Sequence, residues 1–99
     1  MNCTFVEQSP SNFVLSGIIQ HVDAPELART GLQYFCHLDR IELSVTQIDV
    51  FDSALIAVLL AWNRYVLTHN KQLYLRVQSR AVVSLMQMYG VYSIFTHID

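Results

Sequence analysis

The stretch IELSVTQIDVFDSALIAVLL, residues 41–60, decides the fold of this chain. Its first part, residues 41–44, alternates apolar and polar side chains, a pattern typical of a strand with one buried face. Residues 48–51 lead to Asp52-Ser53, a pair that favours a helix start because each side chain can accept a hydrogen bond from an unpaired backbone N–H group. The apolar run that follows predicts a long helix over residues 53–68. The centre of the chain is therefore a strand, a loop and a helix.

Further strands and helices are predicted on both sides of this unit. Asp23 followed by Pro25 favours a helix start, and Gly90 is placed to end a helix that Ser79 caps. The predicted elements are an edge strand at residues 4–7, a strand at 13–19, a helix at 23–35, a strand at 72–77, a helix at 79–89 and a last short strand near 93–95. Strands that alternate with helices predict one α/β domain over residues 1–99, a small mixed sheet with about three helices packed on it.

The composition limits the classes of function. A chain of 99 residues fits one domain, and an apolar content of 53% excludes a disordered chain. Six lysines and arginines against eight acids leave no basic stripe for nucleic acid. Charged residues make up only 14% of the chain, which predicts that part of the surface is apolar and faces a partner protein.

Neither a membrane span nor a secretion signal is expected. The most apolar run, residues 54–62, is too short, because a membrane-spanning helix needs about 20 residues. The start of the chain has no signal-peptide pattern, which predicts a reducing, cytoplasmic compartment. Cys3 and Cys36 are expected as two buried free thiols, with a disulfide between them as the alternative.

No pattern of catalytic or metal-ligating residues is found, so we expect neither an enzyme nor a bound metal or cofactor. The histidines are not at metal-ligand spacing from one another or from a cysteine: they are His21, His37, His69 and His97. Asp49 and Asp52 could form a carboxylate pair for acid–base chemistry, but acids are common at helix starts. The chain also lacks a glycine-rich phosphate loop and a G-x-S-x-G nucleophile motif.

The helix predicted at residues 53–68 has more apolar surface than one core face needs. One stripe, expected to face the sheet, contains Ile56, Leu59, Leu60 and Leu67, and an adjoining stripe contains Leu55, Val58, Trp62 and Tyr65. In the second stripe, Trp62 and Tyr65 either pack against the helix at 79–89 or face a partner. The remaining side is small and apolar in its first half, so that another helix can approach: it contains Ala57, Ala61, Arg64 and Thr68.

The stretch at residues 41–60 resembles the strand, loop and helix signature of the STAS domain, the family of sulfate-transporter tails and anti-sigma-factor antagonists. Leu15-Ser16-Gly17 followed by Asp23 is similar to the L-x-G strand of that family and the acid that opens its first helix. Residues 72–75 resemble its fourth strand, and residues 80–95 resemble its last helix and G-L-x-x-x-F ending. The resemblance covers nearly the whole chain and implies a STAS fold.

The residues at the start of the central helix separate two branches of the family. Antagonists carry Asp-Ser-Ser-Gly there, and a partner kinase phosphorylates the second serine. This chain has Asp52-Ser53-Ala54-Leu55, so the matching position, Ala54, has no hydroxyl group. The chain more closely resembles the MlaB family, the cytoplasmic STAS subunits of the Mla phospholipid ABC transporter of Gram-negative bacteria. In that family the residue after the aspartate matters for contact with the ATPase, and Ser53 occupies this position.

The resemblance implies a non-catalytic subunit that binds and supports an MlaF-like ATPase. The complex would include permease and substrate-binding subunits at the inner membrane, and it would maintain the lipid asymmetry of the outer membrane. The alternative is an anti-sigma-factor antagonist regulated by serine phosphorylation, which here requires Ser53 as the modified residue. We expect a partner interface that includes part of the helix at 79–89 and these residues of the central helix: Asp52, Ser53, Ala54, Leu55, Ala57, Ala61 and Arg64.

Overall fold

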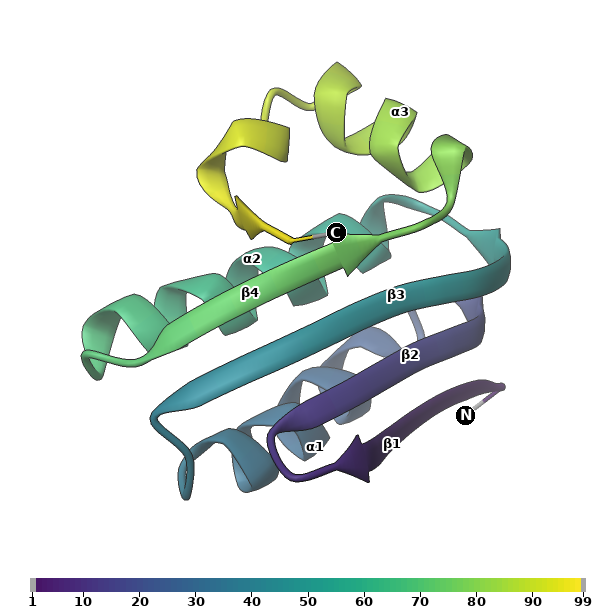
Figure 1. Cartoon of the computed structure of the whole chain (residues 1–99). Helices are drawn as coiled ribbons and strands as arrows, with labels where there is room; N and C mark the ends of the chain where they lie inside the picture. The colour runs from purple at the N-terminus through teal and green to yellow at the C-terminus, as the bar shows by residue number, and fades with distance from the viewer. Residues whose placement is uncertain (1, 99) are drawn as a thin grey trace.

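Five strands form one sheet in the computed structural model, which describes residues 2–98 (Figure 1). Their order in the sheet is the order in the chain, and β1 runs antiparallel to β2 whereas the other neighbouring pairs are parallel. The strands are β1 (Cys3–Ser9), β2 (Asn12–Ile19), β3 (Arg40–Phe51), β4 (Gln72–Val77) and β5 (Thr96–His97). The predicted α/β fold with a small mixed sheet is confirmed.

Helices connect the parallel strands. They are α1 (Ala24–Phe35) after β2, α2 (Ser53–Thr68) after β3 and α3 (Arg80–Met88) after β4, followed by a short 3-10 helix, η1 (Tyr92–Ile94). α1 and α2 lie side by side across one face of the sheet, and α3 and η1 lie near β4 and β5 (Figure 1). The predicted start of α3 is confirmed, because Ser79 Oγ accepts a hydrogen bond from the backbone N–H of Val82 at 3.3 Å.

The core lies between the sheet and the helices. In β3, Ile41, Leu43 and Val45 are buried, whereas Glu42 and Ser44 alternate with them on the opposite face and are half-buried. This is the period of two that a strand imposes on its side chains. Only one face of the sheet therefore contributes to the core.

The opposite face of the sheet carries no helix in the described part of the chain (Figure 1). The guanidinium carbon of Arg40 lies 4.1 Å from the centre of the Tyr74 ring. Arg76 donates a hydrogen bond to Ser44 Oγ at 3.3 Å. These contacts place the cationic groups of Arg40 and Arg76 against other side chains of the sheet.

Trp62 fills the space between α2, α1 and β1. It is fully buried, and its indole N–H donates a hydrogen bond to the carbonyl oxygen of Ala28 in α1 at 3.0 Å. The ring centroid lies 5.2 Å from that of Phe5 in β1 and 5.4 Å from that of Phe35 in α1. The two helices can approach because Gly31 faces the indole without a side chain. The expectation that Trp62 packs against α3 or faces a partner is therefore wrong: α1 and β1 cover it.

One other residue of α2, Leu67, also differs from the prediction. Leu67, expected to face the sheet, is 68% exposed and borders a pocket between α2, β4 and η1. Tyr65 is half-buried, and its ring stacks on His69 one turn further along the helix, with the centroids 4.2 Å apart. The excess of apolar surface inferred from two stripes is thus mostly internal.

Two strands differ from the predicted bounds. β3 is one continuous strand of 12 residues, where a strand at residues 41–44 followed by a loop was expected, because its pairing with β2 continues beyond a register shift at Gly17, near a positive φ of 47° at Gln47. The last strand lies at Thr96–His97 and not at residues 93–95, which form η1. The turn of η1 lets Val91 and Phe95 both reach the core.

The two cysteines are less buried than predicted. Cys3 is half-buried, and Cys36 is exposed because it follows the last residue of α1, where its Sγ contacts the carbonyl oxygen of Gln33 at 3.3 Å. The two do not form a disulfide with each other. Burial raises the pKa of the Cys3 thiol, and the nearby charge of Asp23 raises it further.

Candidate functional site

The start of α2 forms a well-defined exposed corner. Asp52 has an extended backbone, and its Oδ1 accepts a hydrogen bond from the backbone N–H of Ala54 at 2.8 Å. This satisfies one of the unpaired N–H groups of the first turn, and the carboxylate complements the positive end of the helix dipole. Ser53 is the first residue of the helix and is exposed. The capping role predicted for Asp52 is confirmed, and the Ser53 hydroxyl is accessible from solvent.

The turn between β2 and α1 lies beside this corner. β2 and β3 are parallel neighbours that pair Ile19 with Phe51, so both chains leave the sheet at the same edge. His21 Nδ1 consequently lies 4.0 Å from Asp52 Oδ2. Asp23, expected to cap α1, instead accepts a hydrogen bond on Oδ2 from the backbone N–H of Gln20 at 3.1 Å. Its carboxylate therefore closes the turn that presents His21.

The expected interface residues do not all share one surface. Five of them are exposed on the outer side of α2 or at its start: Asp52, Ser53, Ala57, Ala61 and Arg64. Ala54 is 7% exposed and Leu55 is fully buried, because the first turn of α2 directs both positions toward the core. Their expected place on the partner-facing surface is therefore wrong. The "outer face of α2" below means the five exposed residues.

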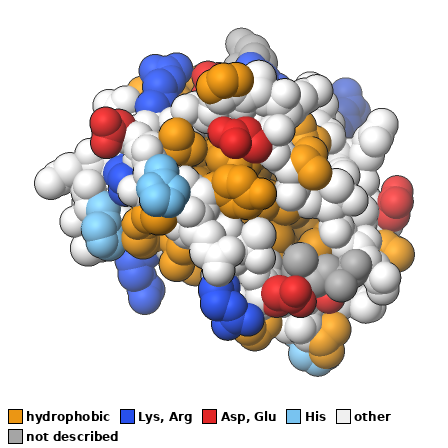
Figure 2. All heavy atoms as spheres, turned by 90° about the horizontal axis from the view of Figure 1, so that it is seen from below, with side chains coloured by type: hydrophobic (Ala, Val, Ile, Leu, Met, Phe, Trp, Pro, Cys, Tyr) orange, Lys and Arg blue, Asp and Glu red, His pale blue; other side chains and the backbone are white. Residues whose placement is uncertain are grey.

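Exposed apolar residues also occur away from the outer face of α2. Val22, next to His21, is 70% exposed, and Val50 near the end of β3 is exposed as well. At the other end of α2, Leu67 and Ile94 border a pocket, and Met88 and Tyr89 are exposed at the end of α3. Figure 2, which views the side of β1 and α1, shows a further apolar area at its centre. Val22 lies in a turn, so no helical or strand periodicity in the sequence indicates that it is exposed.

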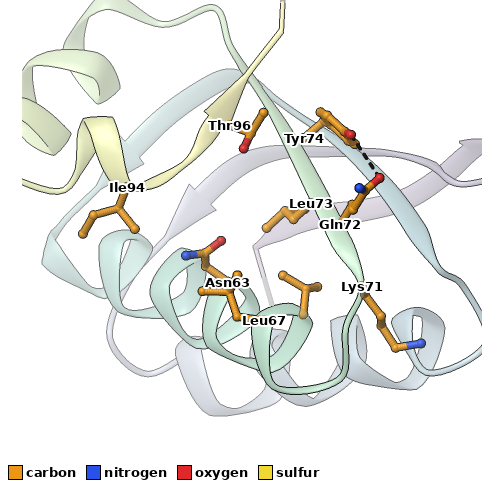
Figure 3. A pocket seen from close by; sticks show the side chains of 9 residues that line it. Asn63, Leu67, Lys71, Gln72, Leu73, Tyr74, Ile94 and Thr96 are labelled. Carbon is orange, nitrogen blue, oxygen red and sulfur yellow. Dashed lines mark hydrogen bonds between the residues drawn. The ribbon is translucent and has the colours of Figure 1, made fainter.

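The pocket near Leu67 lies away from Ser53. Its volume is about 180 Å³, and it lies between α2, β4 and η1 (Figure 3). Asn63 and Thr96 add polar groups to its apolar lining, and the close-up shows Lys71 pointing away from the other labelled side chains. The ammonium group of Lys71 donates to the carbonyl oxygen of Leu38 at 2.6 Å. The ammonium group of Lys71 therefore does not point into the pocket.

The site has the chemistry of a contact surface. Among residues 2–98, no three His, Cys, Asp or Glu side chains lie close enough together to hold a metal ion. His21, the nearest histidine to Asp52, is a surface residue. No helix within the described residues is long and apolar enough to cross a membrane. A hydroxyl group, small side chains and a carboxylate on a rigid helix start can be recognised by another protein.

The family model of the MlaB STAS domain matches residues 6–96. The chain belongs to this STAS domain family. A search of curated protein sequences finds no significant match. STAS domains are generally non-catalytic domains that regulate or bind other proteins, which agrees with the contact chemistry of this corner.

Solved structures of STAS proteins are similar to this chain in fold. The anti-sigma-factor antagonist SpoIIAA in its unphosphorylated form has a TM-score of 0.73 and 12% sequence identity, over 98% of this chain and 88% of that chain. The Bacillus cell fate determinant SpoIIAA in its phosphorylated form has a TM-score of 0.68 and 12% identity, over 98% of this chain and 91% of that chain. At this identity the likeness shows the fold, which confirms the STAS expectation.

Proposed function

We propose that the chain is the non-catalytic STAS subunit of an Mla-type phospholipid ABC transporter and that it binds and supports the ATPase subunit. It would work on the cytoplasmic side of the inner membrane, held there by a complex with the permease and substrate-binding subunits. In that role it contributes to the lipid asymmetry of the outer membrane. The MlaB-type family match supports this proposal.

The observation that carries the proposal is the outer face of α2. Between Asp52 and Arg64 the helix has no charged residue, although Ser53, Ala57 and Ala61 are exposed. A solvated helix face usually carries charged side chains, and small residues let another protein surface come close to the backbone. Ser53 at the start of this face offers a hydroxyl group to a partner.

The test is co-purification with the ATPase subunit of an Mla-type transporter from the same organism. Ser53→Asp places a charge at the start of the outer face, and Ala57→Arg adds a long cation in its middle. Both residues are exposed, so neither substitution disturbs the core. We expect both variants to lose most of the ATPase while they keep the wild-type melting temperature.

Gln33→Arg is the matched control for Ala57→Arg, because Gln33 is exposed on α1 and the same charge is added to a different helix. This control should retain the ATPase at wild-type yield. Co-purification of the ATPase at wild-type yield with Ser53→Asp and Ala57→Arg would rule out the outer face of α2 as the docking surface.

A second candidate, an anti-sigma-factor antagonist, is supported by the exposed hydroxyl of Ser53 at the helix start. The position that matches the phosphorylated serine of antagonists is the nearly buried Ala54, which has no hydroxyl. Intact mass of the protein from growing cells separates the two functions. An added phosphate that disappears in Ser53→Ala would favour the antagonist, whereas an unmodified mass agrees with the transporter subunit.

A further inference from the structure

The turn between β2 and α1 holds an apolar side chain in water. Val22 is 70% exposed. Two hydrogen bonds close the turn around it. The backbone N–H of Asp23 donates to the carbonyl oxygen of Gln20 at 2.9 Å, and the backbone N–H of Gln20 donates to Asp23 Oδ2 at 3.1 Å. The nearly buried carboxylate of Asp23 thus fixes the position of Val22. An apolar residue on a rigid turn loses little conformational freedom on binding, which favours its use as an anchor.

Two carboxylates precede α2 in the chain, those of Asp49 and Asp52. Asp52 Oδ2 has the ring of His21 at 4.0 Å, and its other oxygen caps α2. Asp49, near the end of β3, is exposed. Across residues 2–98, no lysine or arginine nitrogen lies within 4.0 Å of either carboxylate. Asp52 therefore presents a carboxylate oxygen at the exposed start of α2 that faces no lysine or arginine among these residues, and a complementary surface is basic there.

We propose that the ATPase-docking surface continues from the outer face of α2 across the β2–α1 turn, with Val22 as its apolar anchor and Asp52 facing a basic group of the ATPase. This inference rests on the proposed function, because it names the partner through that function. The contact between His21 and Asp52 joins the turn to the helix start, so Val22 and Ser53 belong to one continuous surface. Leu67 and the pocket beside it lie at the other end of α2 and are outside this surface.

The experiment measures the affinity of the purified chain for the purified ATPase subunit of an Mla-type transporter from the same organism, at several salt concentrations. Val22→Ser removes the apolar group and is expected to weaken binding roughly tenfold, the scale of one buried valine side chain. Leu67→Ser is the matched control, because Leu67 is 68% exposed, and it should bind like wild type.

Asp52→Asn tests the charge alone, because asparagine caps a helix as well as aspartate does. Wild-type affinity should fall as salt rises, and Asp52→Asn should bind more weakly at low salt with a smaller dependence on salt. This inference would be overturned if the wild-type chain binds the ATPase, Val22→Ser binds with unchanged affinity and Asp52→Asn keeps the salt dependence of wild type. That result would leave the proposed function standing. Failure of the wild-type chain to bind the ATPase would overturn both.

Discussion

Replacing Gly31 by alanine tests the packing of α1 against α2. A Cβ atom at this position would lie 2.5 Å from both Nε1 and Cε2 of Trp62, where carbon atoms in contact are about 3.5–4.0 Å apart. The indole must therefore move by about 1 Å. It has no free space, because it is fully buried between rings of β1 and α1, and its N–H is bonded to Ala28.

The substitution has a favourable and an unfavourable effect. Alanine in a helix interior is better than glycine by about 0.5–1 kcal/mol. Overpacking of a tight core costs about 1–3 kcal/mol, and weakening the bond from the indole to Ala28 adds about 1 kcal/mol. The free energy of unfolding should therefore fall by about 2 kcal/mol in Gly31→Ala, which lowers the melting temperature by about 10 °C in a domain of this size.

Urea and thermal unfolding followed by far-ultraviolet circular dichroism measure this change without relying on the fluorescence of the displaced Trp62. The control is the same substitution in a Trp62→Leu background, where the smaller side chain leaves room for the Cβ atom. There Gly31→Ala should be neutral or stabilising, so that a double-mutant cycle shows coupling between the two positions. A Gly31→Ala protein as stable as wild type, or more stable, would refute the reasoning.

Three further predictions concern other parts of the fold. Asp52→Ala should lower the free energy of unfolding by about 1 kcal/mol in urea melts, whereas Asp52→Asn should retain most of it, because only alanine lacks a cap acceptor. A thiol reagent should modify the exposed Cys36 before Cys3 in a mass-spectrometric time course at neutral pH, because Cys3 is half-buried and its raised pKa leaves less thiolate. Reaction of Cys3 should speed up as the pH rises toward that pKa; faster labelling of Cys3 at neutral pH would contradict the assignment. Gly90→Ala should lower stability by about 1 kcal/mol in thermal melts, since its φ of +72° is strained for alanine although the space beside it is open; an unchanged melting temperature would argue against that backbone conformation.

Part of the candidate site followed from the sequence. The start of α2 at Ser53, its cap at Asp52 and the small exposed residues Ala57 and Ala61 were predicted correctly from local signals. Such signals act over one helical turn, so the sequence near each residue contains them. The contact of His21 with Asp52 was not predicted, because it depends on the parallel pairing of β2 with β3. No local pattern encodes which turns meet at a sheet edge.

The sequence by itself determined the order of strands and helices, the alternation that buries one face of β3 and the absence of charged residues from α2 between Asp52 and Arg64. Each depends on the spacing of residue types along one element. Only the tertiary structure decided that Trp62 packs on α1, that Leu55 is core and that Val22 is exposed. These outcomes depend on neighbours from distant parts of the chain, above all on Gly31, whose missing side chain lets α1 and α2 approach. Helical periodicity can predict that a helix has two apolar stripes, but the close approach of α1 buries most of the second stripe inside the domain.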